Sequence, residues 1–192
     1  MFDFIKNLHS FSVDGICFKK LNDENLVEVV QGKYKGDINI PSNVNYKGKN
    51  FTVANIGIEA FQDSRNLTSV IIPDSVINIG DYAFNGCSKL KSVSIPNSVA
   101  TIGNEAFSGC TSLKTLTIPH SVTNIGWYAF EGCSGLTSLR SHIENPRKVY
   151  LISDVFLNIP TSICKLFVPQ GSKEAYSKAD QWNSFATILE EI

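Results

Sequence analysis

A 23-residue period runs through the middle of the chain and limits its fold more than any other feature. Phenylalanines recur at this spacing at Phe61, Phe84, Phe107 and Phe130. Glycines, prolines and cysteines follow the same step: Gly57, Gly80, Gly103 and Gly126; Pro73, Pro96 and Pro119; and Cys87, Cys110 and Cys133, with Ser64 in the equivalent place one unit earlier. A fixed period of this length is typical of a solenoid, in which each unit buries its apolar residues against its neighbours.

One unit, residues 73–95, reads PDSVINIGDYAFNGCSKLKSVSI. Its ending, Leu90-x-x-Val93-x-Ile95, matches a strand pattern in which alternate residues face a shared core. Pro96 then ends the strand, because proline has no N–H to continue a ladder of hydrogen bonds. The segment 76–79 predicts a second extended stretch on the opposite side. Gly80 is expected to turn the chain, and DYAFNGC is short enough for one helical or 3-10 turn.

These residues carry a family resemblance. The pattern IPxSVxxIGxxAFxGCxxLxxLxIP occurs as IPDSVINIGDYAFNGC, IPNSVATIGNEAFSGC and IPHSVTNIGWYAFEGC. It resembles the 23-residue repeats of the BspA-like (Treponema pallidum-type) leucine-rich repeat family. The ending LFVPQGSKEAYSKADQWNSF is similar to the terminal cap of such proteins from Bacteroides-group bacteria, and the resemblance covers about residues 38–192. It implies a cell-surface or extracellular protein, with an export signal removed ahead of Met1, whose relatives bind host or matrix proteins.

The expected fold is a leucine-rich repeat solenoid. We predict a right-handed, curved, mostly β array with short helical or 3-10 turns, forming one structural domain. Residues 1–40 should form an N-terminal cap of β-hairpins, built from FSVDGICF, LVEVV and GDINIP. Residues 41–169 should hold the repeats, and residues 170–192 a helical C-terminal cap that covers the otherwise open end of the core.

The first and last repeats are longer than the others. Pro41 to Pro73 leaves room for an extra hairpin, whose turn we expect at Lys47–Asn50. The last repeat lacks an Ile-Pro ending at the expected place, and its next stop is Val168-Pro169. After that stop, Ser172 is the expected N-cap of a helix. Four residues of this helix share one apolar face: Ala175, Tyr176, Ala179 and Trp182.

The sequence contains no motif that supports catalysis or cofactor binding. It has no G-x-G-x-x-G, P-loop, H-E-x-x-H or G-x-S-x-G. The three periodic cysteines should form a ladder of buried thiols about 4.8 Å apart. Such thiols point the same way, which disfavours a tetrahedral metal centre and a disulfide. We therefore predict no catalytic, metal-binding or cofactor-binding residue, and no enzymatic activity.

Charge and hydropathy narrow the choice of partners. The 17 basic and 18 acidic side chains give a net charge of -1, which argues against a nucleic-acid partner. No stretch approaches the ~20 apolar residues of a membrane-spanning helix. The interpretation that the repeats favour is a non-catalytic, adhesin-like module that binds a host or extracellular-matrix protein. A glycan-binding module and a structural spacer are the alternatives, and the sequence leaves the oligomeric state open.

Stacked strands would set their outward side chains in parallel rows, which are the natural binding surface. The rows run through residues 68–71, 91–94, 114–117 and 137–140. The residues predicted to contact a partner are Ser92, Ser94, Thr115, Thr117, Ser138 and Arg140, together with Trp127 and His142 from the irregular last unit. Trp127 replaces a polar residue of the repeat. It is either a surface anchor for the partner or a lid over the last unit.

Overall fold

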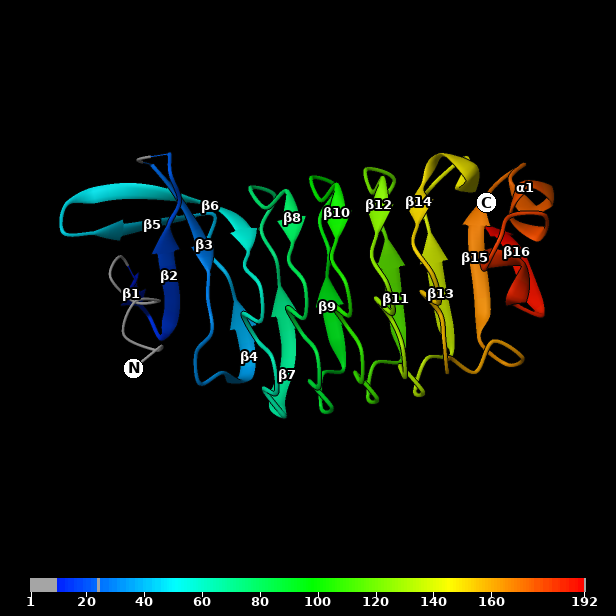
Figure 1. The fold of residues 1–192 in the computed structure, drawn as a ribbon, viewed down its shortest axis with the longest axis horizontal. Helices are drawn as coiled ribbons and strands as arrows, with labels where there is room; N and C mark the ends of the chain where they lie inside the picture. The colour runs from blue at the N-terminus through cyan, green and yellow to red at the C-terminus, as the bar shows by residue number, and fades with distance from the viewer. Residues whose placement is uncertain (1–9, 24, 192) are drawn as a thin grey trace.

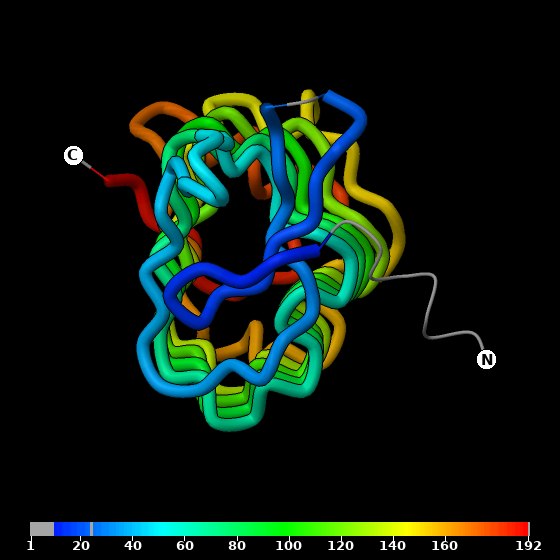
Figure 2. The backbone as a smooth tube through the Cα atoms, turned by 90° about the vertical axis from the view of Figure 1, so that its left-hand side faces the viewer, coloured from blue at the N-terminus to red at the C-terminus, as the bar shows by residue number. Residues whose placement is uncertain are grey.

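The repeat units lie side by side in an elongated array (Figure 1). The computed structural model describes residues 10–23 and 25–191. Viewed along the array, successive units superimpose as coils of similar outline (Figure 2). The predicted mostly β solenoid is therefore confirmed.

Each regular unit gives one short strand to each of two sides of the array. One side is a nine-stranded sheet ordered β1-β2-β3-β6-β8-β10-β12-β14, with β5 paired to β6. Its strands are β1 (Ser10–Val13), β2 (Ile16–Lys20), β3 (Leu26–Val29), β5 (Asn43–Tyr46), β6 (Lys49–Ile56), β8 (Asn78–Ile79), β10 (Thr101–Ile102), β12 (Asn124–Ile125) and β14 (Tyr150–Leu151). The repeat strands among them run parallel.

The other side carries two parallel sheets in succession, β4-β7-β9 and β11-β13-β15-β16. We call the outward surface of these seven strands the strand face. Their bounds are β4 (Lys35–Asn39), β7 (Asn66–Ile71), β9 (Ser92–Ser94), β11 (Thr115–Ile118), β13 (Ser138–Ser141), β15 (Lys165–Pro169) and β16 (Thr187–Glu191). Because all of them run the same way, all begin at one edge of the strand face.

Two of the three N-terminal segments that were predicted to form β-hairpins do so. β1 and β2 are antiparallel around a turn at Asp14-Gly15, and β2 and β3 form a second hairpin. The extra hairpin of the first repeat is also present, with a two-residue turn at Lys47-Gly48 between β5 and β6. The GDINIP segment differs from the prediction: β4 pairs in parallel with β7 and is the first strand of the strand face. Ile40 after it is buried, so this segment extends the core instead of folding back on itself.

The DYAFNGC segments contain successive hydrogen-bonded turns in place of the expected helical or 3-10 turn. Tyr82 and Gly86 both have positive φ angles, 58° and 72°, which a helix cannot continue through. Within the described ranges, helical segments occur only near the C-terminus. They are η1 (Pro146–Lys148), α1 (Lys173–Ser177) and η2 (Trp182–Ser184).

A stack of buried aromatic rings runs along the core. The rings of Phe61, Phe84 and Phe107 are fully buried, with neighbouring centroids 4.8 and 5.0 Å apart and the planes nearly parallel. Phe130 continues the stack, and Phe156 adds a further ring at 6.0 Å. The repeat therefore extends one unit beyond the residues that follow the 23-residue period.

The C-terminal cap is only partly as predicted. Tyr176, Ala179 and Trp182 are buried as expected, but the α-helix is limited to Lys173–Ser177. The Ser172 side chain does not cap this helix, because its hydroxyl donates to the carbonyl oxygen of Pro169. The chain then returns to the strand face as β16, which pairs in parallel with β15.

Candidate functional site

The outward side chains of the strand face form the two rows that the repeat predicts. Ser69 is paired with Ser92 across β7 and β9, and Thr115 is paired with Ser138 across β11 and β13. Two residues further along each strand, a second row runs parallel to the first. Its members from β7 to β16 are Ile71, Ser94, Thr117, Arg140, Phe167 and Leu189.

The strand face is interrupted in its middle. β9 and β11 are neighbours in space, yet they belong to separate sheets. On the opposite side of the same units, β8, β10 and β12 remain paired. The interruption changes burial: Val93 and Ile95 of the β9 unit are half-buried, whereas Leu116 and Ile118, one period later, are buried.

A depression of about 440 Å³ lies at this interruption, where β9 and β11 end. It brings together three of the predicted partner-binding residues: Ser94, Thr117 and His142. Its remaining lining is Asp74, Val93, Ile95, Pro96, Asn97 and Pro119. The depression therefore combines the half-buried Val93 and Ile95 with polar groups that include the carboxylate of Asp74 and the imidazole of His142.

Arg140 lies beside this depression and is held in place by three contacts. Its Nε lies 2.7 Å from Oε1 of Glu191, and its Nη1 donates to the hydroxyl of Ser138 at 3.2 Å. Its guanidinium carbon lies 4.8 Å from the centre of the Phe167 ring. His142 Nε2 approaches the other oxygen of Glu191 at 3.9 Å. The guanidinium group is thus oriented by residues of β15 and β16 and by Ser138 of its own strand.

Trp127 lies apart from these residues. It follows β12, which belongs to the nine-stranded sheet on the other side of the array. Its side chain is 53% exposed, which favours the anchor interpretation over the lid. Tyr150 of β14, in the same sheet, is 66% exposed. The predicted partner-binding residues are therefore divided between two surfaces.

The periodic cysteines form the buried ladder that the sequence predicts. Cys87, Cys110 and Cys133 are fully buried and free. Burial raises the pKa of the Cys87 and Cys133 thiols to about 12, and that of Cys110 well above its ordinary value. A nucleophile must be a thiolate, so these groups are inert at neutral pH. Across residues 10–23 and 25–191, no three His, Cys, Asp or Glu side chains gather in a way that could hold a metal ion.

Sequence reasoning missed four contributors to this site. Val93 and Ile95 were assigned to the core, because the repeat pattern contains no signal for a gap between two neighbouring strands. Phe167 and Glu191 contact Arg140 from later strands, and Glu191 is 51 residues away in sequence. The position of Phe167 could have been found by aligning the irregular last unit with the β13 strand.

Comparison with known proteins identifies the family. Residues 54–179 match six copies of the BspA type leucine rich repeat region. The chain belongs to the BspA-type leucine-rich repeat family. The resemblance seen in the repeat sequence is thereby confirmed, and no curated protein sequence matches this BspA-type chain.

Solved structures of bacterial leucine-rich repeat proteins share the fold. A Bacteroides ovatus protein is 31% identical with a TM-score of 0.70, over 85% of this chain and 48% of that one, so this chain spans about half its length. The Treponema pallidum leucine-rich repeat protein is 22% identical with a TM-score of 0.71, over 94% of this chain and 83% of that one. A leucine-rich cell surface protein of Faecalibacterium prausnitzii is 23% identical with a TM-score of 0.53, over 83% and 54% of the two chains. In the part of the chain that the structure describes, no helix combines the length and apolar character needed to cross a membrane.

Proposed function

We propose that this BspA-type chain is a non-catalytic, adhesin-like module of a bacterial cell-surface or secreted protein, and that it binds a host or extracellular-matrix protein on its strand face. Family membership supports a binding role, and the description of the Faecalibacterium prausnitzii relative as a cell surface protein supports the location. The partner contacts the depression between β9 and β11 and the neighbouring Arg140.

The observation that carries this proposal is the partial exposure of Val93 and Ile95 inside a concave part of the strand face. Hydroxyl-bearing residues at the surrounding positions keep the face soluble but give little binding energy individually. Binding energy concentrates where an apolar or arginine side chain is covered on complex formation. The depression supplies the apolar part, and Arg140 supplies a charged group whose orientation is already fixed.

Blocking the depression tests the proposal. The chain is passed over a panel of purified extracellular-matrix proteins on a biosensor, and the affinity for any protein that binds is measured. Ser94→Arg and Thr117→Arg each place a bulky charge over the depression and should weaken binding at least tenfold. Asn124→Arg makes the same addition on β12, on the opposite side, and should leave the affinity unchanged. Melting temperatures establish that each variant is folded.

Two outcomes would contradict the proposal. Full affinity in Ser94→Arg and Thr117→Arg, together with loss of binding in Trp127→Ala, would assign the partner to the nine-stranded sheet. Failure of the chain to bind any matrix protein of the panel would favour a structural spacer.

A further inference from the structure

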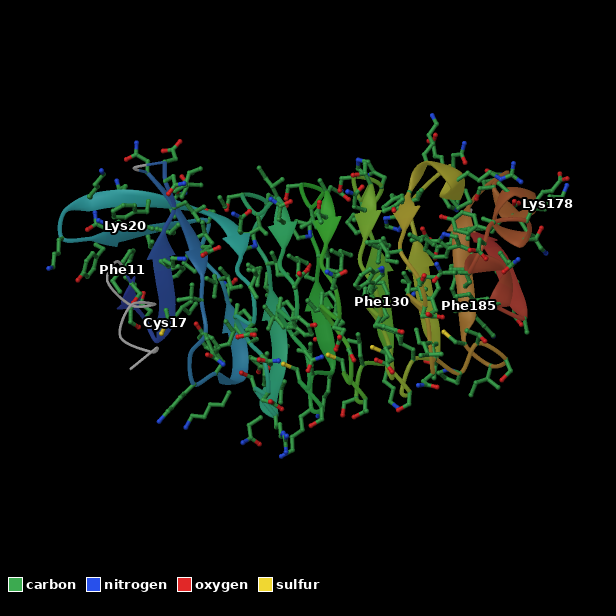
Figure 3. The ribbon with its side chains drawn as sticks, viewed as in Figure 1. Phe11, Cys17, Lys20, Phe130, Lys178 and Phe185 are labelled. Atoms are coloured by element: carbon green, nitrogen blue, oxygen red, sulfur yellow. The ribbon has the colours of Figure 1, made fainter. Side chains whose placement is uncertain are left out.

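Cationic side chains gather at the edge of the strand face where β4, β7, β9 and β11 begin. We call this group the basic edge. It consists of Lys33, Lys35, Arg65, Lys89, Lys91 and Lys114, all of which are exposed. In Figure 3, nitrogen-tipped side chains extend from the lower edge of the array beneath β4, β7 and β9. The basic edge is separate from the depression of the proposed protein site, which lies where β9 and β11 end.

The register of the strands fixes the order of these cations. Lys35 is paired with Asn66 across β4 and β7. Lys89 comes from the next unit, and its Nζ donates to Oδ1 of Asn66 at 3.0 Å. Lys91 and Lys114 occupy the same position of successive units. Cations therefore lie on consecutive units from β4 to β11, with ~4.8 Å per step between the paired strands β4, β7 and β9.

The N-terminal end of the basic edge is hollowed. A depression of about 360 Å³ lies between residues 32–35 and residues 62–66. Lys33 and Lys35 line one side of it, and Arg65 lines the other. Its walls also include the side chains of Gln62 and Asn66 and the carboxylate of Asp63. A negatively charged group that enters the depression meets cations from two directions.

Few carboxylates compensate the basic edge. Asp63 is bound by Arg65, with Oδ1 and Nη2 3.1 Å apart. Asp37 accepts hydrogen bonds from the hydroxyls of Ser69 and Thr68, which are the main reason why its pKa is lowered, and Lys91 adds to the effect. Among the described residues, six cations of the basic edge thus face two carboxylates, an excess of four positive charges in a chain whose net charge is -1.

Acidic side chains are concentrated on a different part of each unit. The first residues of the turns that follow the nine-stranded sheet include Glu59, Asp81 and Glu105. None of these three makes an ion pair with a lysine or arginine in the described part of the chain. Charge is therefore segregated around the solenoid, which leaves the potential of the basic edge largely uncancelled at close range.

We propose that the basic edge binds a sulfated polysaccharide. A single small anion would contact only one or two of the cations, whereas a chain with repeated sulfate groups reaches cations on successive units. Hydroxyl and amide side chains between the cations suit the hydroxyl groups of a sugar. Non-specific binding of single-stranded nucleic acid relies on bases stacked on aromatic side chains. Among the described residues that line the depression, the one aromatic is Tyr34, which is buried.

Heparin is the probe for this proposal. The full chain is titrated onto immobilised heparin at several salt concentrations. We expect binding that weakens steadily as salt rises, because charge pairing drives it. Desulfated heparin should bind at least tenfold more weakly than heparin. Equal binding of the two polysaccharides would overturn the proposal, and so would tighter binding of poly(dT) or of anionic lipid vesicles.

Matched variants distinguish the effect of the basic edge on heparin binding from the effect of the net charge of the chain. Lys33→Gln/Lys35→Gln/Arg65→Gln and Lys89→Gln/Lys91→Gln/Lys114→Gln should each weaken heparin binding at least tenfold. The control triple variant removes the same charge from exposed positions elsewhere: Arg147→Gln/Lys148→Gln/Lys173→Gln. It should change the affinity less than threefold. Equal loss in all three variants would show that net charge alone governs binding. Retention of the melting temperature excludes unfolding as the cause.

Discussion

The thiol of Cys110 donates a hydrogen bond to the carbonyl oxygen of Phe84, with Sγ and O 3.3 Å apart. The equivalent thiols one unit earlier and one unit later repeat the contact at 3.1 and 3.2 Å. Each thiol therefore joins its own unit to the preceding one, as a second donor to a carbonyl oxygen that already accepts a backbone N–H. Ser64 occupies the equivalent place at the start of the series and is also buried, so the position accepts a small side chain.

Stability should fall at alkaline pH because these thiols are neutral and buried. An unfolded cysteine ionises near pH 8.5, whereas the folded pKa of Cys87 and Cys133 is about 12. The folded state then holds more protons than the unfolded state. The contribution of these thiols to the free energy of unfolding should be constant below about pH 8 and should fall by ~1 kcal/mol per thiol between pH 9 and pH 10. Urea unfolding at pH 7.5, 9 and 10 measures this change.

A variant without one of the thiols provides the control. As pH rises, the free energy of unfolding of Cys110→Ala should fall less steeply than that of the parent chain. The difference between the two should equal the contribution of one thiol. The variant should also be only mildly destabilised at pH 7. An unchanged slope, or rapid labelling of Cys87, Cys110 and Cys133 by a thiol reagent in the native state, would contradict the buried ladder.

The periodic glycines have two different physical roles, which substitution by alanine should distinguish. Gly103 does not have a positive φ, but a Cβ there would lie 2.6 Å from the backbone nitrogen of Asp81 and the backbone carbon of Gly80. Gly109 has a φ of 72° and space for a Cβ, whose nearest neighbour would lie at 3.6 Å. Gly103→Ala should therefore cost ~3 kcal/mol or more, because adjacent units must separate.

Gly109→Ala is the matched comparison for this change. It should cost only ~1 kcal/mol, the strain of a left-handed conformation. Both free energies come from urea unfolding at pH 7. Similar costs for the two variants would mean that close packing between units does not explain why Gly103 recurs.

The features predictable from sequence are those that repeat. Phe84 and Cys110 could be assigned to the core because identical residues at a fixed step must occupy equivalent environments. Phe156 escaped this reasoning, because it lies 26 residues after Phe130 and so breaks the period. The left-handed conformation of Tyr82 also escaped, because no glycine marks that position.

The candidate site was predictable only in outline. The rows of outward residues follow directly from strand alternation, so Ser94 and Thr117 could be named in advance. Whether β9 and β11 form a ladder depends on a spacing between units that no single residue determines. The contact of Arg140 with Glu191 depends on the return of the chain as β16, and a helical pattern before that strand gave no sign of it.

Removal of one ring from the aromatic stack should destabilise the whole array. Phe107 is fully buried between two rings whose centroids lie 5.0 and 5.7 Å away. Phe107→Ala should lower the free energy of unfolding by ~3–5 kcal/mol, from lost burial and the cavity that remains. Phe167→Ala, at a half-buried position on the strand face, should cost clearly less. Calorimetry of both variants gives the comparison, and equal losses would mean that the inward face of the repeat is assigned wrongly.

Gln181 ends the array by taking the place of a further unit. Its Oε1 accepts from the N–H of Val155 at 2.7 Å, and its Nε2 donates to the carbonyl oxygen of Ile152 at 2.6 Å. Both backbone groups lose their partners in Gln181→Ala, which should cost ~1–3 kcal/mol. The φ of 62° at this position strains glutamine and alanine alike. The difference in free energy of unfolding therefore measures the two hydrogen bonds of the Gln181 amide.

A charged analogue of Gln181 separates the two hydrogen bonds. In Gln181→Glu the ionised side chain still accepts from Val155 but cannot donate to Ile152, and it brings a negative charge toward that carbonyl oxygen. Its stability should therefore lie below that of the parent chain at pH 7 and should recover in part at low pH, where a protonated carboxyl group can donate. Because other carboxyl groups also titrate in that range, urea unfolding is compared with the parent chain at pH 7 and pH 4. Gln170→Ala, at an exposed glutamine, should be neutral. A neutral effect of Gln181→Ala as well would mean that Ile152 and Val155 need no partner, and that the cap stabilises the array only through its buried aromatic residues.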